Sequence, residues 1–204
     1  MIANALGGTP LRVNGASWAG RKVRLRGIGR ADHRTLIGFD RDSAGSHDGY
    51  RHWAVHRSDA PDAFAIETRH GGILVGSMCV QTDPVSGWFS YGIGIGARHR
   101  RCGYAGDAVT TLLTVMFGQY GYRKCEVSIL GGNFASLSLH GGLGFREEGR
   151  PRDTELVRGG IKYPVLMGIT AAEFDAYPFP SPVRPWRGRH WRTRRRGRHW
   201  RTIP

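Results

Sequence analysis

The segment between residues 98 and 108 (RHRRCGYAGDA) contains the residue types that bind a phosphate group. It follows a strand-like stretch and opens a helical one, and Arg100 to Ala105 fits the pattern R-x-x-G-x-A. The first amides of a helix have no intrahelical partner, so such a turn can present several N–H donors to an anion. The small residue Gly103 keeps the backbone accessible, and the arginines add positive charge. The pattern indicates a phosphate or pyrophosphate site, although a strand-to-helix turn can also hold a glycine for structural reasons alone.

A second segment, residues 133–149, reads NFASLSLHGGLGFREEG. Together the two segments resemble the GNAT superfamily of acyl-CoA-dependent N-acetyltransferases, in particular the Rim-type branch that includes ribosomal-protein alanine acetyltransferases. The first segment fits that family's Q/R-x-x-G-x-G/A pyrophosphate loop. The second fits its N-x-x-S…L-G-F-x-x-E-G signature in spacing and order. The resemblance covers roughly residues 22–173, and both motifs in the right order are more specific than either alone.

The resemblance implies a binding site for acetyl-CoA as co-substrate and no metal. Backbone N–H groups of the loop would hold the pyrophosphate, with the flanking arginines adding charge. The strand ending at Ile93 and Ile95 would pair its edge with the pantetheine amides. Asn133 would contact the cofactor arm, whereas Ser136 would help to cap or orient its helix. The residues implied in cofactor binding are Ile93, Ile95, Arg98, Arg100, Arg101, Cys102, Gly103, Tyr104, Ala105, Asn133 and Ser136.

The resemblance also implies positions for the acid and the base. His140 stands where many family members have the tyrosine that protonates the leaving thiolate, and histidine can donate a proton near neutral pH. A single histidine on a helix is more often a surface or packed residue, so both interpretations stay open. Ser90 stands near the position of the family's usual basic glutamate, and a serine cannot act as a base alone. Asp83, Glu67 and Tyr91 are the alternatives for the base.

Hydrophobic periodicity predicts the elements that must position these residues. Apolar residues at helical spacing predict a long helix over residues 103–117 and shorter helices over 32–40 and 133–143. Predicted strands cover residues 22–27, 64–69, 73–81, 87–96, 123–130, 145–150 and 162–170. This order predicts an α/β (α+β) fold with a mixed, mostly antiparallel central sheet of about six to seven strands flanked by helices. The resemblance implies that this fold is GNAT-like. The resemblance implies that the parallel pair, 87–96 and 123–130, splays apart to form the acyl-CoA cleft.

The net charge of +14 suggests nucleic-acid binding, but most of it lies in a tail. Nine of the 30 Lys and Arg residues lie between residues 184 and 201, which leaves 21 basic against 16 acidic side chains before them. The tail repeats RGRHWRT, and arginine interleaved with tryptophan can bind RNA or the ribosome. An exact short repeat can also arise by duplication in GC-rich coding DNA, without a function. We predict a flexible arm (residues 1–20), an acetyltransferase domain (21–176) and a Pro-rich linker with a disordered basic tail (177–204).

The composition excludes several other classes of protein. A hydrophobic fraction of 40% is that of a globular protein, and the absence of a run of about 18 apolar residues excludes a membrane-spanning helix. The first 20 residues lack a secretory-signal pattern, so a cytoplasmic location is expected. The three cysteines fit neither a disulfide framework nor a zinc site. Cys102, within the phosphate loop, is interpreted as a variable loop position rather than as a nucleophile.

The function that this pattern predicts is direct transfer of acetyl from acetyl-CoA to a primary amine, on a protein N-terminus or a small molecule, by a monomer or homodimer. Two alternatives stay open. One is an acyl-CoA-binding protein of GNAT fold without catalysis, suggested by Ser90 and His140. The other is an RNA- or ribosome-binding protein that acts through the basic tail. Nothing in the sequence identifies the acceptor.

Overall fold

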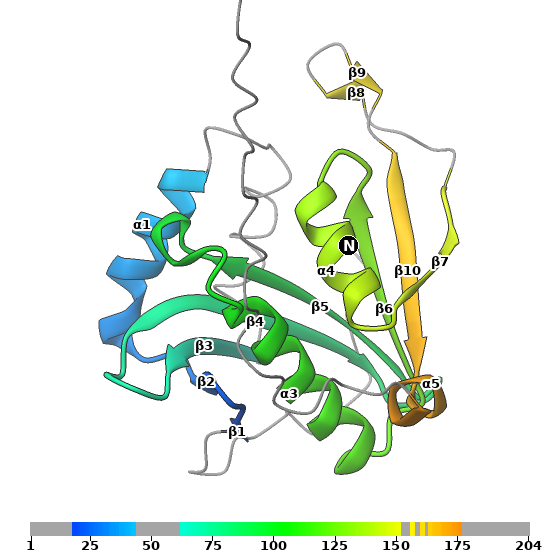
Figure 1. Cartoon of the computed structure of the whole chain (residues 1–204), viewed down its shortest axis with the longest axis horizontal. Coiled ribbons are helices and arrows are strands. Elements are labelled where there is room, and N and C mark those ends of the chain that lie inside the picture. Colours follow the sequence, from blue (N-terminus) through cyan, green and yellow to red (C-terminus); the bar gives the residue numbers. More distant parts are fainter. Residues whose placement is uncertain (1–17, 44–61, 152–155, 158–159, 162, 177–204) are drawn as a thin grey trace, which may run out of the picture.

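The computed structural model describes residues 18–43, 62–151, 156–157, 160–161 and 163–176, and a sheet of eight strands runs through them (Figure 1). The strand order is β1-β2-β3-β4-β5-β6-β10-β7, and every neighbouring pair is antiparallel except β5 and β6. A separate short pair, β8 with β9, lies outside this sheet. The strands are β1 (Trp18–Ala19), β2 (Val23–Gly27), β3 (Ala63–Thr68), β4 (Leu74–Asp83), β5 (Trp88–Ile95), β6 (Lys124–Leu130), β7 (Arg146–Gly149), β8 (Leu156–Val157), β9 (Gly160–Ile161) and β10 (Pro164–Thr170). The predicted mixed, mostly antiparallel α/β fold is confirmed.

Two helices, α3 and α4, lie over one face of the sheet (Figure 1). They are close neighbours, because a Cβ added at Gly106 of α3 would lie 3.6 Å from Leu139 of α4. Helix α1 packs beside β4 and a short 3-10 helix, η2. The helices are η1 (Arg30–Asp32), α1 (His33–Ser43), η2 (Ala97–His99), α3 (Tyr104–Gly118), α4 (Phe134–Gly142) and α5 (Ala171–Ala176). None of these helices is long and apolar enough to cross a membrane.

The sheet separates an apolar face from a polar one because side chains alternate along each strand. In β2, Val23 and Leu25 are fully buried in the core with α3, whereas Arg24 and Arg26 point to the opposite face. The same alternation continues across the sheet to β5, where Phe89 and Tyr91 join the core. Ser90 therefore lies on the face opposite α3, which we call the polar face.

The structure differs from the sequence prediction at short elements. Trp18 and Ala19 form β1 within the predicted arm and pair with β2, which makes the sheet larger than expected. The segment between the predicted strands 145–150 and 162–170 contains the β8–β9 pair, and α5 follows β10 without a break. Two- to six-residue elements are too short for periodicity to reveal. Residues 1–17 and the basic tail lie outside the described residues.

The helix predicted over residues 32–40 implies that Asp32 lies at its N-terminus, and this is wrong. The helical segment begins earlier, with Gly29 as the N-cap of η1. The Asp32 carboxylate instead accepts the Gly29 N–H at 2.8 Å and forms an ion pair with Arg26 at 2.6 Å. Hydrogen bonding from Arg26 holds the pKa of Asp32 below its usual value. Asp32 thus fixes the turn between β2 and α1 to the polar face of the sheet.

Candidate active site

The parallel strands β5 and β6 pair over only three positions. Trp88, Phe89 and Ser90 lie opposite Lys124, Cys125 and Glu126, and the pairing ends there. Strand β5 continues to Ile95 with partners on β4 alone, while β6 continues to Leu130 with partners on β10. Within the described residues, no strand pairs with the β6-facing edge of Tyr91–Ile95. The predicted splayed pair is therefore present, and main-chain groups of Ile93 and Ile95 lie along its open edge.

The predicted phosphate loop connects β5 to α3 through η2 (Figure 1). Gly103, the N-cap of α3, has a left-handed backbone with φ of 78° and gives no side-chain cap. The first helical hydrogen bond runs from Asp107 N–H to the Gly103 carbonyl at 3.2 Å. The amides of Tyr104, Ala105 and Gly106 thus precede it, at the positive end of the helix. This arrangement can hold an anionic group at the helix N-terminus.

Arg101 adopts the left-handed conformation as well, with φ of 64°, and it is the one non-glycine residue with positive φ in the described part of the chain. A side chain in this region costs on the order of 1 kcal/mol. The loop therefore retains Arg101 at an energetic cost. Its exposed side chain adds positive charge to the loop.

Asp107 and Lys22 fasten the loop and helix to the start of β2. The Asp107 carboxylate accepts the backbone N–H groups of Arg21, Lys22 and Val23 at 2.7 to 3.0 Å. The Lys22 ammonium donates to the Cys102 carbonyl at 2.8 Å, and a Cβ at Gly103 would come within 2.9 Å of Lys22 Nζ. Asp107 is therefore more than a favourable charge at the helix N-terminus, because it connects α3 to the sheet.

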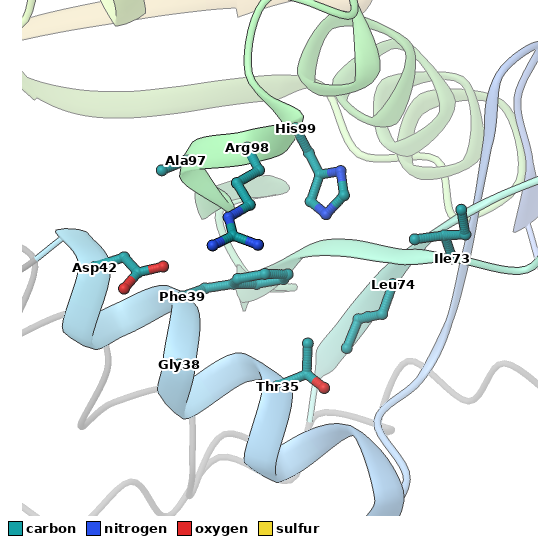
Figure 2. Close-up of a pocket in the computed structure, with 9 residues that line it drawn as sticks. All are labelled: Thr35, Gly38, Phe39, Asp42, Ile73, Leu74, Ala97, Arg98 and His99. Carbon is teal, nitrogen blue, oxygen red and sulfur yellow. The ribbon is translucent and has the colours of Figure 1, made fainter.

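The remaining loop side chains lie in different directions. Arg100 folds back and donates from Nε to the Ile95 carbonyl at 3.2 Å. Arg98 points toward α1, where it lines an open pocket together with Phe39 and Asp42 (Figure 2). Cys102 is an exposed, free thiol. The structure thus brings Arg101 and the first α3 amides to one place and directs Arg98 to another.

His140 is buried, and both of its ring nitrogens are engaged. Nδ1 lies 2.7 Å from the Ser136 carbonyl, which can only accept, so Nδ1 carries the proton. Nε2 then accepts the Tyr91 hydroxyl at 2.8 Å. Burial lowers the pKa of His140 and raises the pKa of Tyr91. The acid role of His140 stays a prediction, and in the neutral ring Nε2 has no proton to donate.

Asn133 and Ser136 both take part in the start of α4. Asn133 is the N-cap, and its side-chain oxygen accepts the Ser136 N–H at 3.1 Å. The Ser136 carbonyl lies 2.7 Å from His140 Nδ1. Because the side-chain oxygen of Asn133 (Oδ1) accepts the hydrogen bond of the cap, the side-chain NH₂ is the group left for the predicted contact with the cofactor arm.

Three sequence alternatives for the base have other roles in the structure. Glu67 is ion-paired with Arg24 and Arg26 at the β2–β3 end of the sheet. Asp83 accepts hydrogen bonds from Ser86 and Val85 in the β4–β5 turn. Tyr91 is the hydroxyl donor to His140.

Sequence reasoning missed Glu126. It lies directly opposite Ser90, on the same polar face, at the last paired position before β5 and β6 diverge. Its side chain is 45% exposed and forms an ion pair with Lys124 at 2.7 Å. The alternation of buried Cys125 and Val127 around it was the available signal. The register with Ser90 could not be read from the sequence.

A parallel pair that splays apart beside an open helix N-terminus can hold an extended ligand along the strand edge and its anionic group at the helix. The sequence profile described as "Acetyltransferase (GNAT) domain" matches residues 26–146, more than half of the chain. The chain belongs to this family and is a GNAT N-acetyltransferase. The family implies acetyl-CoA as co-substrate.

Relatives agree with this assignment. The SPbeta prophage-derived uncharacterized N-acetyltransferase YokL of Bacillus subtilis is 23% identical over 78% of this chain and 95% of its own length. A GCN5-related N-acetyltransferase from Brucella melitensis superimposes with a TM-score of 0.64 at 22% identity, covering 78% of this chain and 80% of that one. A putative ribosomal-protein-serine acetyltransferase from Vibrio cholerae gives 0.62 at 20% identity, covering 80% and 99%. A chimera of the spermidine N-acetyltransferase SpeG from Vibrio cholerae and hSSAT gives 0.64 at 19%, covering 76% and 99%. These structures show the common fold.

No group of three or more potential metal ligands occurs among the residues that the structure describes.

Proposed function

We propose that this acetyltransferase transfers acetyl directly from acetyl-CoA to a primary amine, with Glu126 as the general base. The observation that carries the proposal is the position of Glu126 opposite Ser90, where β5 and β6 separate. The family's usual glutamate is missing at position 90, and the neighbouring strand supplies a carboxylate beside it. Both side chains lie on the polar face, away from α3 and α4.

The cofactor side of the reaction is served by groups on the other elements. Acetyl-CoA supplies the activated acetyl group as a thioester. The amides of Tyr104, Ala105 and Gly106, with the charge of Arg101, hold the pyrophosphate at the start of α3. The open edge of β5 up to Ile95 offers main-chain donors and acceptors to the pantetheine amides, as in strand addition.

The reaction requires one proton to leave the amine and one to reach sulfur. Glu126 accepts the proton of the attacking amine as the nitrogen–carbon bond forms and the carbon–sulfur bond breaks. The predicted acid, His140, would reach the thiolate through the Tyr91 hydroxyl. In the protonated form, His140 Nε2 donates to Tyr91 while Tyr91 donates its own proton to sulfur, which leaves a neutral His140 whose Nε2 accepts from the Tyr91 hydroxyl.

The acceptor class is tested with amines chosen from the names of the structural relatives and from the Rim-type resemblance. The panel contains spermidine and peptides that begin with serine or alanine, and thiol release reports turnover. We expect Glu126→Gln to lower kcat by about 100- to 1,000-fold with KM for acetyl-CoA unchanged. Glu147→Gln is the matched control, because Glu147, on β7, is exposed and forms an ion pair with Arg150 just after the strand.

Three results would contradict the proposal in different ways. Failure of the wild-type chain to bind acetyl-CoA in calorimetry would remove the cofactor site. Binding without turnover of any amine would favour an acyl-CoA-binding role. Full activity of Glu126→Gln would exclude Glu126 as the base.

A further inference from the structure

Lys124 lies between two carboxylates on the polar face of the sheet. Its Nζ is 2.7 Å from Glu126 Oε1 and 2.9 Å from Glu148 Oε2. Lys124 precedes Glu126 by two residues on β6, so both side chains leave the same face of the strand. Glu148 approaches from β7, on the far side of β10 in the sheet.

Glu148 reaches Lys124 because of two features of the neighbouring strands. The register between β7 and β10 shifts between Leu166 and Met167, which pair with Gly149 and Glu147 respectively. This irregularity leaves Glu148 without a direct partner residue on β10. A Cβ at Gly168 would overlap the Glu148 carboxylate, so glycine at this position provides the space that the carboxylate occupies. The position of Glu148 is therefore built into the sheet.

The stability gained from these contacts is small. The three side chains are 34 to 45% exposed, and ion pairs between exposed side chains add little to the free energy of unfolding. Both carboxylates act in the same direction on Lys124, because their hydrogen bonds raise its pKa and keep it an ammonium. A fixed ammonium can hold one oxygen of a carboxylate in place and leave the other available.

We propose that Lys124, anchored by Glu148, is a positioning residue that holds Glu126 Oε1 so that Oε2 is the oxygen that accepts the amine proton. This inference rests on the proposed function, because it requires Glu126 to be the base. Within the described ranges, Lys124 is the ion-pair partner of Glu126. Glu126 and Glu148 lie within ion-pair distance of Lys124, and the charge of Lys124 also acts on Glu173.

A double-mutant cycle separates positioning from a general structural role. We expect Lys124→Met to lower kcat by about 10- to 100-fold, the size expected for a misplaced catalytic group, with KM for acetyl-CoA unchanged. In the Glu126→Gln background, Lys124→Met should cause no further loss. Lys124→Arg should restore part of the activity, because it retains the charge and the donors.

Glu148→Gln tests the contact of Glu148 with Lys124 without changing the backbone or the side-chain volume. Gly168→Ala places a methyl group on β10 where the Glu148 carboxylate lies and so displaces it. Both should lower kcat in the same direction as Lys124→Met but by less, whereas Glu147→Gln should have no effect. Chemical unfolding of each variant checks that it is folded. A Lys124→Met loss of equal size in the wild-type and Glu126→Gln backgrounds would overturn the inference, as would an unchanged kcat.

The same variants distinguish the positioning role of Lys124 from the base role of Glu126. If Glu126→Gln is inactive and Lys124→Met is fully active, only the positioning role fails. If Glu126→Gln is fully active, the base assignment of the proposed function fails, and the positioning role fails with it.

Discussion

Glu67 and Glu126 lie on the same polar face of the sheet but have opposite surroundings. Glu67, near the β2–β3 end, is 5% exposed and contacts the guanidinium groups of Arg24 and Arg26. Arg26 in turn pairs with Asp32. Glu126, at the point where β5 and β6 separate, is 45% exposed and pairs with one lysine among the described residues.

This difference shows why burial and charge alone do not identify a base. Both oxygens of Glu67 are bound by arginine side chains, which are always protonated. A carboxylate in that state cannot accept a further proton without losing its partners. Glu126 has one oxygen held and the other available at an open strand edge, so the more exposed of the two groups is the better candidate for chemistry.

Exchange of Glu67 for glutamine should have the largest effect on stability and little effect on chemistry. Glu67→Gln leaves Arg24 and Arg26 facing a neutral amide, which should cost about 3 kcal/mol of unfolding free energy. Urea unfolding measures the loss, with Glu147→Gln as the control. The activity of the folded fraction should stay within about threefold of wild type, because Glu67 is bound in the ion-pair network. A folded but inactive Glu67→Gln would reverse the roles of the two carboxylates.

The sequence predicted the framework of this face better than its chemistry. Alternating patterns located each long strand and the α3 helix to within two residues at most ends, because these elements bury a regular apolar face. The loop from Arg100 to Ala105 could be predicted because the backbone conformation itself requires a small residue, as at Gly103 with its φ of 78°. Glu126 was missed because its importance depends on register with Ser90, and Glu67 was retained as an alternative because its two arginines are partners only in the folded sheet.

His140 resembles Glu67, because its hydrogen-bonding capacity is fully used. His140→Ala removes a buried ring that contacts Tyr91 and Phe145 and leaves the Tyr91 hydroxyl without its acceptor. We expect a loss of about 2 to 3 kcal/mol in unfolding free energy. Ser138→Ala, on the exposed side of α4, is the control. An unchanged unfolding free energy for His140→Ala would contradict the packing role, and an unchanged kcat of the folded variant would contradict the proposed acid role.

The two groups should also separate in their pH dependence. Burial lowers the pKa of His140 from about 6.5, so its stabilisation is complete above that pH and is lost as pH falls below it, because the unfolded state then binds more protons. Burial opposes the shift at Glu67, but hydrogen bonds from Arg26 and Arg24 lower its pKa overall, so its contribution is lost only below about pH 4.5. When the pH falls from 7.5 to 5.5, the unfolding free energy of wild type should decrease by about 1 kcal/mol more than that of His140→Gln. Urea unfolding at both pH values measures this difference. An equal decrease of the unfolding free energy in wild type and His140→Gln would contradict the assignment.

Arg101 differs from both Glu67 and His140. Its backbone conformation lowers the stability of the fold, while its charge serves the proposed binding of acetyl-CoA. Its φ of 64° favours glycine over any residue with a Cβ. Arg101→Gly and Arg101→Ala remove the same charge, so both should raise KM for acetyl-CoA by a similar factor of about three to ten, the size of one exposed charge contact with a phosphate. Their stabilities should differ, with the glycine variant about 1 kcal/mol more stable than the alanine variant, the reverse of the usual order. Thermal unfolding of the two variants without ligand measures the backbone strain, and acetyl-CoA titration measures the charge. An alanine variant as stable as the glycine variant would show that the loop relaxes, and Arg101 would then carry charge at no structural cost.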